Sequence, residues 1–144
     1  MNHVIGAKPP IWFRIVAVLA LLWNLMGVWS YLAHVGAIPP MKPMTAGQEA
    51  LAATVPSWVV GAFAVAVFSA VLASLGWLML KSWSRTLFAL SLLCIVAQMA
   101  WIVFISDARE IEGNMALLMP ALVTAIGLLN LWLTSLGVRK GWLT

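Results

Sequence analysis

Three carboxamide side chains lie inside long apolar runs of this sequence. Asn24 stands in the stretch LLWNLMGVWSYL (21–32), and Gln98 and Asn130 stand in two later runs. An amide in such a place can form a hydrogen bond to a neighbouring helix and hold the two in register. It can also line a small polar cavity that binds an uncharged solute. The sequence leaves both interpretations open.

Residues that could support catalysis or metal binding are not grouped in the sequence. Ser69, Ser74 and Ser91 have no histidine or carboxylate in their apolar runs to act as a base. His3 and His34 are separated by the whole first apolar run, so they are not expected to share a metal ion. Cys94 is the single cysteine and is expected to be a small core residue. We therefore expect a protein that is not an enzyme, with no catalytic residue, cofactor or metal site.

The elements that must position the three amides are membrane-spanning helices. The chain has 144 residues, of which 64% are hydrophobic and 8% charged, whereas about a quarter of a soluble domain is charged. Four continuous apolar runs each reach the roughly 20 residues that cross a bilayer as a helix, and they lack the alternation of barrel strands. The predicted spans are 11–33, 58–80, 84–106 and 115–136. The fold class is all-α, a four-helix membrane bundle forming one domain over 1–144.

The first span also has features of a signal peptide. Lys8 and Arg14 could form its basic region, and 35–37 a cleavage site. Its apolar stretch is longer than the 7–15 residues that such peptides use, so we interpret it as a retained helix.

The distribution of charge predicts the orientation. Six cations and no acid lie on the side that carries both termini and the loop between the second and third spans: Lys8, Arg14, Lys81, Arg85, Arg139 and Lys140. The other side carries Lys42 and Arg109 together with Glu49, Asp107, Glu110 and Glu112. Lysine and arginine are retained on the cytoplasmic side, so both termini are expected there. The net charge of +4 follows from membrane insertion and does not indicate nucleic-acid binding.

The connections between the spans are short except for the first. There, Thr45 and Gln48 have the spacing of a capping box, which predicts a short helix over 46–53 lying at the outer membrane surface. In the other outer loop, 107–114 is expected to form one capped turn. The short connection 81–83 predicts a tight hairpin, so the second and third spans should be antiparallel neighbours.

Each predicted span has one face of small or polar residues, if each residue turns the helix by about 100°. Small side chains let helices approach closely, and polar ones can bond across the contact. These faces are expected to point into the bundle. They comprise Ala20, Asn24, Gly27 and Tyr31; Ala62, Ala66, Ser69, Ala73 and Gly76; Ser91, Cys94, Gln98 and Trp101; and Pro120, Val123, Gly127, Asn130 and Thr134.

Counting residues from the cytoplasmic ends places Asn24 and Gln98 at the same height. We therefore predict a hydrogen bond between their side chains, with Asn130 about a turn and a half closer to the cytoplasm. The alternative is a small polar cavity with Tyr31 and Trp101 at its mouth. No acidic, basic or histidine side chain lies in the interior of any span, whereas ion-coupled carriers usually have one there.

Several stretches carry a resemblance to a known group of proteins. They are VPSW (55–58) running into GAFAVAVFSAVLASLGWLML (61–80), SLLCIVAQ (91–98) and GWL (141–143). Across these stretches the chain resembles small bacterial four-helix inner-membrane proteins of uncharacterised mechanism, some of which are automatically labelled "sugar transporter". The resemblance implies a multi-pass protein of the bacterial inner (cytoplasmic) membrane, and it carries over no catalytic or transport residue.

Two functions are consistent with these features. The first is a non-enzymatic accessory or assembly subunit of a larger membrane complex, whose partners are the lipid bilayer and other membrane subunits or further copies of the chain. The second is a small oligomeric carrier for an uncharged solute such as a sugar, bound by the amides and aromatic side chains.

Overall fold

The structure is a computed structural model of the 144-residue chain, and it describes residues 8–39, 43–106, 110, 113 and 115–144. These residues form α1 (Ile11–His34), α2 (Ala46–Ala53), α3 (Ser57–Leu78), α4 (Trp83–Phe104) and α6 (Met115–Arg139). Four of the helices are long and apolar enough to cross a membrane, and the described residues contain no strand. The predicted all-helical fold with four candidate spans is therefore confirmed.

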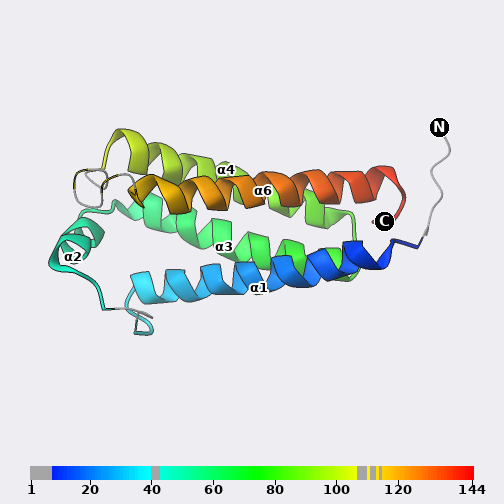
Figure 1. The fold of residues 1–144 in the computed structure, drawn as a ribbon, viewed down its shortest axis with the longest axis horizontal. Helices are drawn as coiled ribbons and strands as arrows, with labels where there is room; N and C mark the ends of the chain where they lie inside the picture. Colours follow the sequence, from blue (N-terminus) through cyan, green and yellow to red (C-terminus); the bar gives the residue numbers. More distant parts are fainter. Residues whose placement is uncertain (1–7, 40–42, 107–109, 111–112, 114) are drawn as a thin grey trace.

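The four long helices lie side by side and alternate in direction (Figure 1). The close helix pairs are α1 with α3, α3 with α4, and α4 with α6. The start of α1 and the end of α6 lie at one end of the bundle, which we call the terminal end, and α2 lies at the opposite end (Figure 1). The predicted pairing of the second and third spans is confirmed.

A tight turn reverses the chain between α3 and α4. Leu80 adopts a left-handed conformation with φ of 59°, and the backbone N–H of Lys81 donates to the carbonyl of Gly76 at 2.8 Å. These are features of a Schellman motif, in which the turn satisfies the last carbonyls of a helix. The predicted hairpin is therefore present, and it ends α3 without a glycine.

The capping box predicted for the short helix is present in α2. The hydroxyl of Thr45 accepts a hydrogen bond from the backbone N–H of Gln48 at 3.2 Å, and the Gln48 side chain accepts one from the N–H of Thr45 at 3.0 Å. Its location at a membrane surface stays a prediction. The capped turn predicted over 107–114 lies outside the described residues, apart from Glu110 and Gly113.

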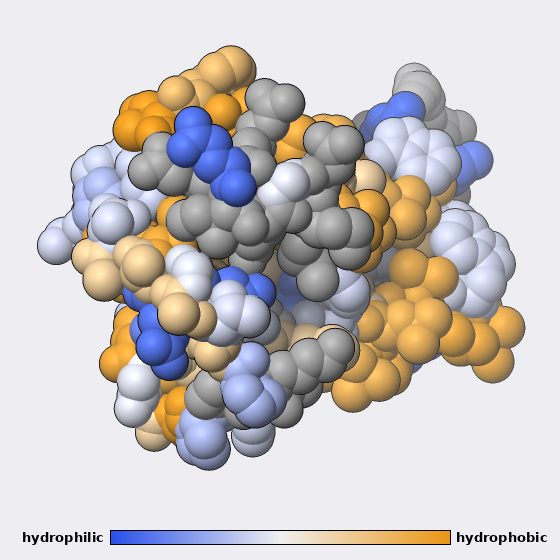
Figure 2. Space-filling model, turned by 60° about the vertical axis from the view of Figure 1, so that its left-hand side comes forward, coloured by the Kyte–Doolittle hydropathy of each residue, from blue (hydrophilic) through white to orange (hydrophobic). Residues whose placement is uncertain are grey.

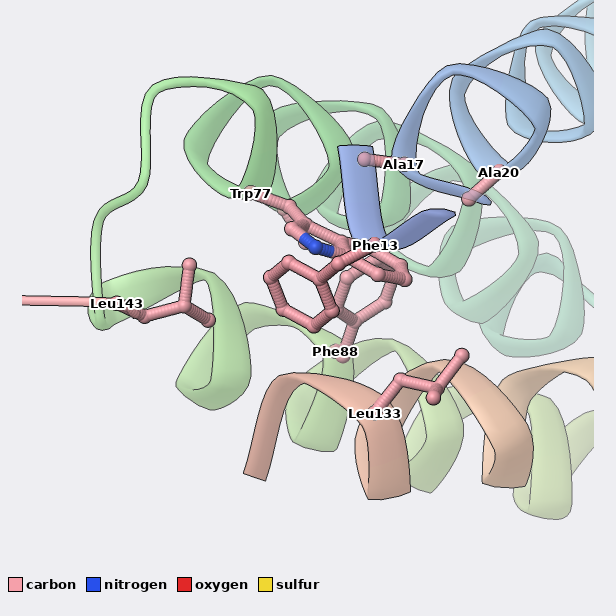
Figure 3. Close-up of a cluster of buried hydrophobic side chains, with 8 residues drawn as sticks. Phe13, Ala17, Ala20, Trp77, Phe88, Leu133 and Leu143 are labelled. Atoms are coloured by element: carbon pink, nitrogen blue, oxygen red, sulfur yellow. The ribbon is translucent and has the colours of Figure 1, made fainter. Parts of the chain in front are cut away.

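An aromatic cluster fills the terminal end of the bundle (Figure 3). Phe13 and Trp77 are fully buried, with ring centroids 5.2 Å apart. Trp77 meets the ring of Phe88 edge-on at 6.0 Å, and Phe13 meets Trp142 at 5.0 Å. Residues from α1, α3, α4 and the segment after α6 thus close this end of the bundle.

The last four residues fold back over the hairpin between α3 and α4. Gly141 has a φ of +76°, which lets the chain turn sharply after α6. Leu143 is buried in the aromatic cluster, the N–H of Thr144 donates to the carbonyl of Leu80 at 3.1 Å, and the hydroxyl of Ser82 donates to the carbonyl of Thr144 at 3.1 Å. The C-terminal segment is therefore an integral part of the packing at the terminal end.

The outer surface of the long helices is apolar. Figure 2 looks toward the end that carries α2, where hydrophilic side chains are scattered among others, while hydrophobic ones gather on the right-hand side of the view. Large apolar side chains are exposed on every long helix, among them Leu19, Leu72, Leu93 and Leu128. Such a surface is stable against lipid tails and agrees with the multi-pass interpretation.

The packing at the terminal end predicts that Gly137→Ala destabilises the protein. A Cβ at this position would lie 2.6 Å from the Cζ atom of Phe13 and 3.0 Å from Leu143, so a fully buried ring must move. Overpacking of this kind costs about 1–3 kcal/mol, which exceeds the gain of up to about 1 kcal/mol from replacing a helical glycine. Thermal unfolding in detergent should show a lower Tm.

Gly61→Ala is the matched control for this substitution. It lies in the exposed part of α3, and a Cβ there meets nothing within 4 Å, so its Tm should be unchanged or higher. Equal Tm values for the two variants would contradict the tight packing of Phe13 against α6.

Candidate functional site

The small-residue face of α3 points into the bundle, as predicted. Ala66, Ser69, Ala73 and Gly76 are buried, and Ala62 is half-buried. Much of this face contacts α4 of the same chain. The hydroxyl of Ser91 donates to the carbonyl of Ala66 at 2.8 Å, and a Cβ on Gly76 would lie 2.5 Å from the ring of Trp83.

Asn24 forms its hydrogen bonds with α3 rather than with Gln98. Its amide nitrogen donates to the hydroxyl of Ser74 at 2.7 Å and to the carbonyl of Ala70 at 3.3 Å. The predicted Asn24–Gln98 bond is therefore wrong. The physical reason is the packing order, because α1 lies against α3 while Gln98 belongs to α4.

The height predicted for Asn24 relative to Gln98 is also wrong. Asn24 bonds α3 on the terminal side of Ala66, whereas Gln98 lies about two turns beyond Ser91, the partner of Ala66, toward α2. Counting from the span ends assumes that all helices begin at one level and run without tilt. In the structure Asn24 lines the same pocket as Asn130, whereas Gln98 lines a second pocket. The two asparagines therefore belong together, and the glutamine lies apart from them.

Two other residues of the predicted faces have packing roles. Tyr31 meets the rings of Phe63 and Phe68 on α3, with centroids 5.5 and 5.7 Å away. Gly27 lies against Val67, which a Cβ would approach at 3.3 Å. Tyr31 and the buried Trp101 line neither of the two pockets described below, so they do not form the mouth of either one.

The first pocket, which we call the central pocket, lies between all four long helices. It has a volume of about 30 Å³. Its polar side chains are Asn24 of α1, Ser91 of α4 and Asn130 of α6, and Phe88 also lines it. Because Phe88 belongs to the aromatic cluster, that cluster bounds the pocket on the side of the terminal end.

Asn130 is the least satisfied polar side chain of the central pocket. Only 4% of the residue is exposed, and its side-chain amide forms no hydrogen bond with any described residue. The hydroxyl of Thr134 donates at 2.8 Å to the backbone carbonyl of Asn130, which leaves the amide free. Unlike the indole nitrogen of Trp77, which is enclosed by protein atoms and has no partner, the amide of Asn130 is open to the space of the pocket.

The second pocket, which we call the outer pocket, lies between α3, α4 and α6 and has a volume of about 180 Å³. Gln98 is the one polar side chain among its described lining residues, which are Phe63, Ala66, Ile95, Gln98, Met99, Ile102, Pro120 and Val123. Ile95 and Val123 line both pockets. The two pockets are therefore neighbours, and the outer one is mainly apolar.

Pro120 lies inside α6, in its second turn, and lines the outer pocket. Proline has no N–H, so the helix lacks one backbone hydrogen bond at this point. The hydroxyl of Thr124 donates to the carbonyl of Pro120 at 2.8 Å and lies 2.9 Å from the sulfur of Met99. Pro120 thus forms part of the pocket wall. Beside it, Thr124 of α6 contacts Met99 of α4.

Comparison with known proteins adds no further information on the site. No protein-family model, curated protein or solved structure matches this chain. The functional interpretation therefore depends on the geometry of the two pockets and of the outer surface.

The Asn24–Ser74 contact predicts an energetic coupling between α1 and α3. In a double-mutant cycle of Asn24→Ala and Ser74→Ala, the coupling free energy of unfolding should be about 0.6 kcal/mol and at most about 1.7 kcal/mol, the range for such bonds in a membrane protein. Unfolding by SDS titration in mixed micelles would measure it.

Ser69→Ala provides the control cycle with Asn24→Ala. The Ser69 hydroxyl donates to the carbonyls of Val65 and Ala66 in its own helix, so this pair should show no coupling. Equal coupling in both cycles would contradict a specific Asn24–Ser74 bond.

Proposed function

We propose that this chain is a non-enzymatic integral membrane protein that acts by binding other membrane proteins, as an accessory or assembly subunit of a larger complex. The observation that carries the proposal is the size and lining of the two interior pockets. The central pocket has three polar side chains in its lining, but its volume is only about 30 Å³. The outer pocket is larger, and its described lining has one polar side chain, that of Gln98.

The same geometry gives little support to a carrier for sugars. A sugar presents several hydroxyl groups, and leaving any of them without a partner in a dry site lowers affinity. Gln98 alone cannot bond them all, and the central pocket is too small for a sugar ring. Neither of these two pockets among the described residues offers a sugar enough polar partners, which favours a role for the apolar outer surface.

The order of helix packing leaves surface for a partner. The close pairs run from α1 to α3, α4 and α6, and α1 and α6 do not form a close pair of their own. Side chains at the terminal end join them, where the ring of Phe13 lies beside Gly137. A transmembrane helix of another subunit can pack against the exposed apolar faces of these two helices, which include Leu22 and Leu122.

The small-residue face of α3 is less available for such a partner. Its residues Ala66 and Gly76 already contact Ser91 and Trp83 of the same chain. A partner would therefore bind through larger side chains, such as those of α1 and α6, by van der Waals packing.

The proposed orientation in a bacterial inner membrane places the terminal end in the cytoplasm. Lys81, Arg85, Arg139 and Lys140 are exposed at or near that end, while Glu49 on α2 lies at the other. Retention of cations on the cytoplasmic side supports this direction, and the resemblance to bacterial inner-membrane proteins supports the location.

Cysteine labelling tests the orientation. In a Cys94→Ala background, a membrane-impermeant maleimide added to intact cells should label Glu49→Cys and leave Thr144→Cys unlabelled until the membrane is permeabilised. Both positions are exposed, so access to the reagent decides the result. Labelling of Thr144→Cys alone would reverse the proposed orientation.

Site-specific photo-crosslinking in native membranes tests the subunit role. A photoreactive amino acid at Leu22 of α1, Leu93 of α4 or Leu122 of α6, all exposed, should give one adduct of defined mass from one side of the bundle. That adduct should survive mild solubilisation and contain a second membrane protein in a constant ratio.

Two outcomes would contradict the subunit role. Adducts with lipid alone at all three positions would leave the surface without a protein partner. Adducts between copies of this chain, together with sugar uptake by reconstituted vesicles, would favour the oligomeric carrier.

A further inference from the structure

The central pocket is lined by a polar side chain, the amide of Asn130, that has no hydrogen-bond partner among the described residues. The residue Asn130 is 4% exposed, its amide lines the pocket, and no described residue accepts from it or donates to it. Buried polar groups in proteins are nearly always satisfied, either by protein atoms or by ordered water. This amide therefore points to a ligand in the pocket.

The size of the pocket restricts that ligand to a very small molecule. A volume of about 30 Å³ exceeds the roughly 10–15 Å³ of probe-occupied volume that one water molecule needs. A sugar, a lipid head group or another organic solute does not fit.

The polar groups around the pocket match the bonding capacity of water. Asn24 uses its amide nitrogen on α3, which leaves its side-chain oxygen as an acceptor. The Ser91 hydroxyl donates to the carbonyl of Ala66 and can still accept. Asn130 has both a donor and an acceptor available. A buried water typically forms about three hydrogen bonds, and these three side chains can supply them.

We propose that the central pocket is a binding site for an ordered water molecule, held by Asn24, Ser91 and Asn130. The water bridges α1, α4 and α6 and connects the two helices, α1 and α6, that are not a close pair. This role is independent of the subunit function proposed above.

The outer pocket provides the route by which this water exchanges. Ile95 and Val123 line both pockets, so their side chains form the common wall. On the opposite side, Phe88 and the aromatic cluster close the way to the terminal end. The pockets together form an inlet that ends in the middle of the bundle.

Water-edited solid-state NMR of the ¹⁵N-labelled protein in lipid bilayers tests the bound water. At short mixing times, the side-chain amide of Asn130 should receive magnetisation from water. The indole N–H of Trp77 is the internal control, because it is buried, has no hydrogen-bond partner and lines neither pocket. An Asn130 amide that stays as dry as this indole would overturn the proposal.

The exchange route has a separate test with a matched pair of variants. Val123→Phe thickens the common wall and should slow deuterium exchange at the Asn130 side chain at least tenfold. Leu122 is the neighbour of Val123 in the sequence and is exposed on the outside of α6. Leu122→Phe should therefore leave the exchange rate unchanged. Equal exchange rates in the two variants would overturn the route through the outer pocket. The NMR test of the bound water uses the wild-type protein, so it does not depend on how either variant folds.

Discussion

The close approach of neighbouring helices to α3 is the constraint on which this bundle depends. Lipid tails are as apolar as leucine, so apolar side chains alone give transmembrane helices little reason to associate. Ala66 and Gly76 on α3 let α4 come near enough for the Ser91 hydrogen bond and for the ring of Trp83 to fit. Ala70 and Ser74 receive Asn24 from α1. Accordingly, α3 has the largest buried share of the four spans, 39% over its most apolar window.

The two halves of the bundle are built differently as a consequence. At the terminal end, large rings and the C-terminal segment fill the space between the helices. Toward α2, the space is filled less completely, and the outer pocket remains between α3, α4 and α6. The central pocket lies where the two kinds of packing meet, with Phe88 on one side and Ile95 and Val123 on the other. Any water or ligand that enters the protein is therefore expected to stay in the half near α2.

Individual residues differ in how much of their role could be predicted from the sequence. The capping box of Thr45 and Gln48 is local, involving residues three apart, and it was predicted correctly. The inward face of α3 was also correct, because helical periodicity determines which residues share a side. The partner of Asn24 could not be predicted in the same way, since it depends on which helices are neighbours and how far each is shifted along its axis. Ser74, which bonds Asn24, lies outside the face predicted for α3; its hydroxyl in an apolar span was visible in the sequence, but its partner was not.

The sequence by itself determined the class of protein, the four candidate spans, the short capped helix and the hairpin. These follow from hydropathy and from contacts between residues close in the chain, which do not depend on the rest of the fold. Only the tertiary structure decided that Asn24 bonds α3, that Asn130 shares its pocket, and that Gln98 lies in another. Apolar helices can pack in several orders and registers at similar energy. The choice among them depends on the fit of side chains such as Phe13, Trp77 and Leu143, which meet only when the whole chain is folded.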